Sequence, residues 1–229
     1  MKALEIELTS ACNARCPICM RTRLIERGIP VKKEHYTVDN IKQYFDPIDM
    51  KGMRVKFCGV LGDPIACPEL YEISEYFLNR EVKHIEVSTN AGLKTTKWWE
   101  RYGELSSKSD NRLEIHFAID GVNTNDYRVG VNLEKVWNNV DTYLNAGGFA
   151  SWQYIIFKYN EHELEEARTI AKDKGMKFIA DSVKEATFSN PKPIEEHLAE
   201  QLILAANNDS NSPSVKKKHE LERIAQASR

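Results

Sequence analysis

The sequence predicts an α/β protein built on an open sheet of six parallel strands, a (βα)6 partial TIM barrel. Short apolar or alternating runs recur six times along the first 185 residues, and amphipathic runs of helical period separate most of them. Strands that alternate with helices at this spacing require right-handed crossovers and therefore a parallel sheet. Six units are fewer than the eight of a closed barrel. A flat, doubly wound sheet would show the same alternation.

The predicted elements follow one another at short intervals. The strands occupy residues 3–9, 53–58, 83–89, 112–119, 152–157 and 177–180. The helices occupy residues 37–45, 68–79, 95–105, 133–146 and 163–174. Local signals mark several helix ends, since Thr37 is placed to cap one helix, Pro68 to open another and Gly147 to end a third. Residues 20–36 are rich in Arg, Lys and Gly, and predict an irregular excursion.

The regular alternation ends near residue 185. Two prolines interrupt it, a short helical run follows, and residues 207–214 form a polar linker of low complexity. A charged, helical tail containing the run Lys216–Lys218 completes the sequence. The sequence therefore predicts a core domain at residues 1–185 and a helical extension at residues 186–229.

Composition excludes several classes of protein. The 229 residues include 41% hydrophobic and 29% charged residues, as in soluble globular proteins. A net charge of −2 gives no general attraction to nucleic acid or to an anionic membrane. The apolar runs are far shorter than the roughly 20 residues of a membrane helix, and the acidic N-terminus lacks the apolar core of a signal peptide. We therefore predict a cytoplasmic protein without membrane or nucleic-acid partners.

Three of the five cysteines stand directly after the first predicted strand, as Cys12, Cys16 and Cys19. Such clustering suits a reduced metal site better than a disulfide framework. Thiolates are soft ligands for iron–sulfur clusters or zinc. Three cysteines hold three irons of a [4Fe–4S] cluster and leave the fourth open, whereas electron-transfer clusters usually have four protein ligands. The open iron points to chemistry there.

The spacing Cys-x₃-Cys-x₂-Cys after a first strand resembles the signature of the radical S-adenosylmethionine (radical SAM) superfamily. The resemblance implies that the open iron chelates SAM. One electron from the cluster then cleaves SAM to methionine and a 5′-deoxyadenosyl radical, which removes a hydrogen atom from the substrate. An external one-electron donor, such as a flavodoxin or ferredoxin, is implied as a partner.

Further segments resemble the family's SAM-binding motifs at the ends of later strands. Leu61-Gly62-Asp63 resembles the Gly-Gly-Glu motif, in which glycine lets the main chain approach the ligand and a carboxylate holds the amino group of SAM. A βα turn would use the same residues. Arg128 resembles the arginine that binds the SAM carboxylate in bidentate fashion. Ile18, beside the last cysteine, stands where the family contacts adenine.

Two more segments resemble the family's ribose contacts. Ser88 and Asn90 follow the third predicted strand, and Asp120 follows the fourth. Ala118 stands where many relatives carry Ser, so Asn90 or Asp120 takes over that contact in this interpretation. Asn and Asp next to glycine are also ordinary turn formers.

The segment Tyr154–Glu163 resembles one branch of the family, whose members often carry a C-terminal cysteine-rich SPASM domain. This sequence shows no such domain, which indicates a fragment or a short form. The resemblance favours an oxidoreductase that modifies a peptide or protein. Two alternatives remain open: a structural zinc module with His35 or Cys58 as fourth ligand, and a degenerate scaffold without turnover.

Overall fold

The computed structural model describes residues 3–182. The chain divides into two units, Met1–Ser182 and Val183–Arg229, and the described residues lie in the first. The helical extension expected at residues 186–229, with its linker at 207–214, lies outside the described residues. Within the described residues, no helix is long and apolar enough to cross a membrane.

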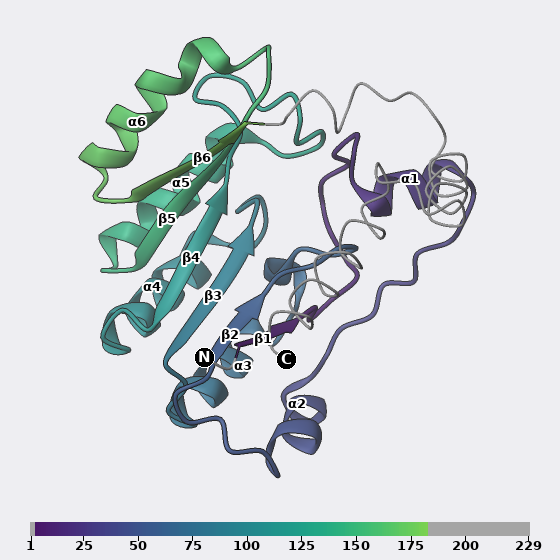
Figure 1. Ribbon diagram of the computed structural model, residues 1–229, viewed down its shortest axis with the longest axis vertical. Coiled ribbons are helices and arrows are strands. Elements are labelled where there is room, and N and C mark those ends of the chain that lie inside the picture. The colour runs from purple at the N-terminus through teal and green to yellow at the C-terminus, as the bar shows by residue number, and fades with distance from the viewer. Residues whose placement is uncertain (1–2, 183–229) are drawn as a thin grey trace, which may run out of the picture. The chain divides into compact units, whose positions relative to one another are not determined.

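Six parallel strands form one open sheet in the order β1-β2-β3-β4-β5-β6, with β1 and β6 at its two edges (Figure 1). The strands are β1 (Ala3–Ile6), β2 (Arg54–Phe57), β3 (His84–Thr89), β4 (Leu113–Ala118), β5 (Phe149–Ile156) and β6 (Lys177–Ser182). The predicted open six-stranded fold is therefore confirmed.

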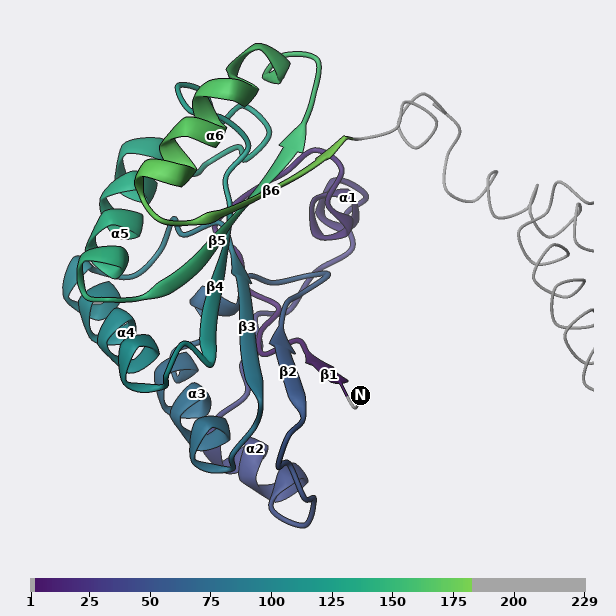
Figure 2. The same cartoon turned by 60° about the vertical axis from the view of Figure 1, so that its left-hand side comes forward.

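The α-helices are α1 (Met20–Glu26), α2 (Val38–Phe45), α3 (Leu70–Asn79), α4 (Thr96–Lys108), α5 (Leu133–Asn145) and α6 (Leu164–Asp173). Short 3₁₀ turns, η1 (Pro64–Ala66) and η2 (Glu161–Glu163), precede α3 and α6. Figure 2 shows α3, α4, α5 and α6 along one face of the curved sheet. These four helices leave the opposite face of the sheet uncovered.

The two faces of the sheet differ in chemistry. Along β3, Ile85 and Val87 are fully buried on one face, and His84, Glu86 and Ser88 alternate with them on the other. Side chains alternate in this way because the strand repeat is two residues. The apolar face packs against α3, α4 and α5.

The core between the sheet and the helices is aromatic. Trp99 of α4, Phe117 of β4 and Tyr143 of α5 are fully buried. Their ring centroids lie 5.7–6.0 Å apart, within the range of favourable tilted and edge-to-face contacts. Each such contact adds about 1 kcal/mol to the gain from burial. This core fixes the helices against the sheet and thereby fixes the loops at the strand ends.

The prediction of an irregular segment at residues 20–36 is wrong for its first part. Helix α1 begins immediately after Cys19, whose carbonyl accepts a hydrogen bond from Arg23 N at 3.1 Å. Gly28, with φ of +73°, ends the helix in the left-handed conformation that glycine tolerates. The composition suggested a loop, but the residues between Cys19 and Gly28 are mostly good helix formers.

The predicted start of the second helix is confirmed. Thr37 Oγ1 accepts a hydrogen bond from Asn40 N at 3.2 Å, and Thr37 N donates to Asn40 Oδ1 at 3.1 Å. This reciprocal pair is a capping box, which satisfies two backbone donors at once.

Candidate functional site

A cavity of about 350 Å³ opens where the carboxyl ends of β1 to β5 meet. Its lining includes the three clustered cysteines, the loop after β2, the ends of β3 and β4, and the pair Tyr127 and Arg128. We call it the thiol cavity. Sites of parallel α/β folds form in this position, because the loops after the strands gather at one edge of the sheet.

Cys12, Cys16 and Cys19 all line the thiol cavity. The loop that carries them is fixed by its own backbone: Ala14 N donates to Cys12 Sγ at 3.3 Å, and Cys19 N donates to the Cys16 carbonyl at 3.0 Å. Within residues 3–182, no three side chains of His, Cys, Asp or Glu converge closely enough to hold one metal ion. The thiols border a shared space that has room for a larger group.

Burial controls the protonation of these thiols. Burial, reinforced by the nearby Asp63 carboxylate, raises the pKa of Cys12 to about 11. Burial also raises the pKa of Cys16, against the opposing effect of Arg128. Both thiols are therefore protonated at neutral pH in the metal-free chain, and a metal that binds them must displace the protons.

The buried Asp63 ties two loops of the site together. Its Oδ1 accepts a hydrogen bond from Ile65 N at 3.0 Å, and its Oδ2 accepts one from Asn90 N at 2.8 Å. Burial raises the pKa of this carboxyl, although these hydrogen bonds oppose the shift. Asp63 lines the thiol cavity and thus presents an acceptor that is already oriented.

Gly62 has a packing reason to be glycine. A Cβ on this residue would lie 1.8 Å from the Thr9 carbonyl oxygen, so any side chain would displace the backbone. The sequence predicted that glycine lets the main chain approach a ligand. In the structure, the close approach is to the loop after β1.

Two predicted polar contacts lie on the cavity wall. Ser88 Oγ is buried and has no hydrogen-bond partner among the described residues. Such a group costs about 1–3 kcal/mol unless something satisfies it. Asn90 donates from Nδ2 to Asn13 Oδ1 at 3.1 Å, and more weakly to Cys12 Sγ at 3.7 Å. The unsatisfied hydroxyl leaves a hydrogen-bonding group on the wall for a polar ligand.

Arg128 lines the cavity and is held from behind by Asp120. Arg128 Nε donates to Asp120 Oδ2 at 2.8 Å, and Asp120 Oδ1 accepts a hydrogen bond from Ile155 N at 2.9 Å. Burial raises the pKa of Asp120, and the charge of Arg128 opposes the shift. Asp120 itself is fully buried and does not line the cavity, and neither does Ile18. The structure therefore brings together eight of the ten predicted site residues.

Sequence reasoning missed Glu7 and Tyr127. Glu7 Oε1 accepts hydrogen bonds from Leu61 N at 2.6 Å and Gly62 N at 3.0 Å, and so fixes the loop after β2. Tyr127 lines the thiol cavity, with its ring centroid 4.7 Å from that of Phe157. The alternating acidic residues of the first strand include Glu7, and the Tyr–Arg pair includes Tyr127. Their contacts, Leu61 and Phe157, lie far away in the sequence, so the roles of these two residues could not be predicted.

A network of charged residues covers the polar face of the sheet. Glu114 contacts His84 Nε2 at 3.0 Å and His116 Nε2 at 3.3 Å, and His116 Nδ1 lies 3.4 Å from Glu86. Burial would raise the pKa of Glu114, but hydrogen bonds from His116, His84 and Ser151 outweigh it and hold this pKa well below its usual range. The polar face is thus charged and internally paired.

His35, one candidate for a fourth zinc ligand, lies apart from the thiol cavity. Its Nδ1 is 2.8 Å from Thr9 Oγ1, and it does not line the cavity. Cys58, the other candidate, does line it.

Comparison with known families gives two matches, which overlap at residues 162–171. The model of the radical SAM superfamily matches residues 6–171, and the model of ribosomal protein S7p/S5e matches residues 162–229. Small ribosomal subunit protein uS7 of Cenarchaeum symbiosum is 70% identical over 57 residues, which are 25% of this chain and 29% of that protein. The uS7 protein of Picrophilus torridus is 30% identical over 155 residues, 66% of this chain and 75% of that protein.

Solved structures resemble the fold. Native anSMEcpe with bound AdoMet and Cp18Cys peptide has a TM-score of 0.56 at 14% identity, over 79% of this chain and 50% of that one. Native anSMEcpe with bound AdoMet has a TM-score of 0.57 at 16% identity, over 79% and 52% of the two chains. The chain thus spans about half the length of these structures.

Proposed function

Because the chain belongs to the radical SAM superfamily, with a C-terminal segment of ribosomal protein S7p/S5e type, we propose that it is an enzyme that reductively cleaves SAM to modify a substrate. Its cofactors are those of the superfamily, a [4Fe–4S] cluster and SAM. When bound, they supply a 5′-deoxyadenosyl radical for hydrogen abstraction. One observation carries the proposal: the three thiols share a cavity with an oriented carboxylate, an unsatisfied hydroxyl and a partly buried guanidinium.

In this proposal, Cys12, Cys16 and Cys19 hold three irons of the cluster. They border the cavity together and supply three soft ligands for the cluster. Cys58, on the same wall, is not assigned to the cluster. Cys58 lines the same cavity as the three assigned cysteines and therefore serves as a control in the experiments on them.

Asp63 and Arg128 bind the amino-acid end of SAM. Asp63 accepts a backbone hydrogen bond on each oxygen and a further one from the Thr89 side chain, which leaves an acceptor site for an ammonium group. Arg128 Nε already donates a hydrogen bond to Asp120. The terminal Nη groups of Arg128 are therefore the ones that would bind the carboxylate of SAM. Ser88 and Asn90 serve the ribose, and Asp120 acts through Arg128.

We extend the proposal to a peptide or protein substrate and to an electron donor of the flavodoxin or ferredoxin type, both acting in the cytoplasm. The resemblance of the segment Tyr154–Glu163 and the peptide bound in one structural relative support the substrate class. The cofactor requirement of the family supports the donor.

Anaerobic reconstitution tests the cofactor assignment. A brown protein that absorbs near ~400 nm, with about four irons per chain, supports the cluster. A colourless protein with one tightly bound zinc would instead favour the structural zinc module. A loaded cluster that binds SAM without cleaving it would favour the degenerate scaffold.

A second candidate function rests on the C-terminal likeness to uS7. The 70% identity over 57 residues supports association of that segment with the small ribosomal subunit. Co-sedimentation with small subunits depleted of uS7 tests it, with the full chain compared with a chain that ends at Ser182. If the full chain sediments with the small subunits and the chain that ends at Ser182 does not, the association is supported. Equal co-sedimentation of the two chains would refute it.

A further inference from the structure

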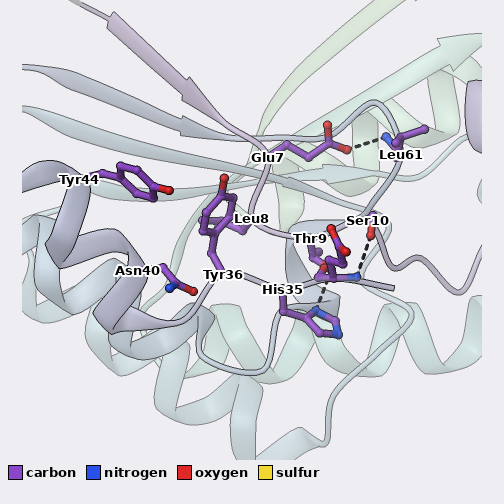
Figure 3. Close-up of a pocket in the computed structure, with 10 residues that line it drawn as sticks. Glu7, Leu8, Thr9, Ser10, His35, Tyr36, Asn40, Tyr44 and Leu61 are labelled. Atoms are coloured by element: carbon purple, nitrogen blue, oxygen red, sulfur yellow. Dashed lines mark hydrogen bonds between the residues drawn. The ribbon is translucent and has the colours of Figure 1, made fainter. Parts of the chain in front are cut away.

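A second cavity, larger than the thiol cavity, lies beside the start of the chain. Its volume is about 560 Å³, and we call it the tyrosine groove (Figure 3). Residues from three places line it: the loop after β1, the segment before and within α2, and the loop after β2. Leu61 lines both the tyrosine groove and the thiol cavity, so one side chain stands between the two spaces.

Two tyrosines give the groove exposed aromatic surface. Tyr36 is 40% and Tyr44 58% exposed, and their ring centroids lie 6.4 Å apart in an edge-to-face pair. Large aromatic side chains left this open are typical of binding surfaces, because their rings offer contact area at little cost in conformational entropy.

Two carboxylates accompany the tyrosines. Glu7 and Glu34 both line the groove, and no lysine or arginine side chain does. No ion pair within residues 3–182 uses either carboxylate. Figure 3 shows Glu7 pointing one oxygen at Leu61. The groove therefore combines negative charge without a cation and aromatic faces, the combination that binds guanidinium and ammonium groups.

The backbone around the groove suits an extended chain. Residues 34–36 run antiparallel to residues 8–10: Ser10 N donates to the Glu34 carbonyl at 3.1 Å, and Tyr36 N donates to the Leu8 carbonyl at 2.9 Å. Residues 8–10 are thus already paired, but β1 (Ala3–Ile6), which leads into the groove at Glu7, is an edge of the sheet. Edge strands present backbone groups to a partner. An extended segment is thus the natural carrier of a cation in this groove.

We propose that the tyrosine groove binds a basic side chain of an extended peptide, with Glu34 and Glu7 facing the cation and Tyr36 and Tyr44 against its alkyl stem or its charged group. The proposal does not rest on the proposed cofactor chemistry, because it concerns binding in a separate cavity. The shared residues give it a consequence for the other site. Glu7 also holds Leu61 and Gly62, so a cation at Glu7 shifts the affinity of the thiol cavity for SAM, and SAM shifts the peptide affinity by the same factor.

Calorimetric titration of the full chain tests the proposal with three probes. Acetyl-Ala-Arg-Ala-amide carries the cation, acetyl-Ala-citrulline-Ala-amide keeps its shape without charge, and agmatine carries the cation without a peptide. We expect the arginine peptide to bind at least about tenfold more tightly than the citrulline peptide. Glu34→Gln and Tyr44→Ala, both at exposed positions, should each weaken the arginine peptide about tenfold.

Matched variants guard against general effects. Glu104→Gln removes an exposed carboxylate on α4, and Ile48→Ala removes an exposed apolar side chain just after α2. Neither residue lines the groove, and both variants should bind as the parent does. Equal binding of the two peptides, absence of binding, or unchanged affinity in Glu34→Gln would overturn the proposal. Agmatine that binds as tightly as the arginine peptide would overturn the peptide part and assign the groove to a small cation.

Discussion

Side chains around the thiol cavity divide into those that face it and those that hold the facing ones. Arg128 lines the cavity, and Asp120 fixes Arg128 through a hydrogen bond. In the same way, Leu61 lines the cavity, and Glu7 fixes the backbone of Leu61. A supporting contact fixes geometry before any ligand arrives, and this lowers the entropic cost of binding. The supporting residues are therefore as important to the site as the facing ones.

The proposed division among the cysteines predicts a clear contrast. Cys16 and Cys58 both line the thiol cavity, but only Cys16 is assigned to the cluster. After anaerobic reconstitution, Cys16→Ala should lose most of its iron and its absorption near ~400 nm, because three thiolates are needed to hold the cluster. Cys58→Ala should retain both. Equal iron content in the two variants would contradict the assignment of Cys16, and not Cys58, to the cluster.

The geometry at Arg128 predicts an effect on SAM affinity. Arg128→Lys keeps a positive charge but loses the planar fork that binds a carboxylate with two hydrogen bonds. We expect SAM to bind about tenfold more weakly to the reconstituted variant in equilibrium dialysis. Arg15→Lys, at an exposed position of the cysteine loop, should bind SAM as the parent does. A loss of similar size in both variants would show that the effect is not specific to the fork of Arg128.

Which of these residues the sequence revealed depends on how local their signal is. Cys12, Cys16 and Cys19 stand within one loop, so their spacing alone was informative. Glu7 acts on a loop 54 residues away, and nothing in its surroundings identifies that partner. The role of Asp120 was interpreted as a ligand contact, whereas the structure places it behind Arg128, because burial is not visible in a sequence.

The packing of the loop after β2 against the loop after β1 depends on Gly62. A Cβ at this position would lie 1.8 Å from a backbone oxygen of the loop after β1. Gly62→Ala should lower the free energy of unfolding by about 3 kcal/mol, since neither loop can move without breaking its hydrogen bonds.

Gly52 supplies the control for that experiment. It has φ of +73° and nothing within 4 Å of its absent Cβ, so Gly52→Ala should cost only about 1 kcal/mol for the left-handed backbone. Urea unfolding of both variants measures the difference. Equal costs would mean that the loops tolerate the clash.

The charged face of the sheet predicts a pH dependence of stability. The folded state holds the pKa of Glu114 well below its usual range, so the contact contributes fully above the unfolded pKa of about 4.3 and is lost as pH falls below it. The loss of unfolding free energy caused by Glu114→Gln should therefore be largest near neutral pH.

Denaturant titrations at several pH values test this expectation. The difference between the parent and Glu114→Gln should shrink below about pH 4. Glu104→Gln, at an exposed site on α4, should show little difference at any pH. A difference that grows as the pH falls would contradict the assigned sign.

Elements with strong local signals were predictable, and those defined by tertiary contact were not. The capping box at Thr37 and the glycines after the fourth predicted helix revealed their helix ends. Helix α1 was missed because its start is set by the cysteine loop, not by a capping side chain. β5 begins at Phe149, earlier than predicted, because pairing with β4 extends it.

At the scale of the whole molecule, the alternation of strands and helices was enough to predict the parallel order of the sheet. Short crossovers of one hand leave few alternatives. The curvature that separates a partial barrel from a flat sheet arises from packing across many strands, so it required the resemblance as well. The likeness of the C-terminal part to uS7 could not be derived from its charge or composition.

Everything proposed for the thiol cavity depends on SAM being cleaved there. The most direct measurement is 5′-deoxyadenosine formed when the reconstituted full chain is incubated anaerobically with dithionite and SAM. We predict 5′-deoxyadenosine from the parent and from Cys58→Ala, and none from Cys16→Ala. A parent chain with an intact cluster and bound SAM that forms no 5′-deoxyadenosine would contradict the account.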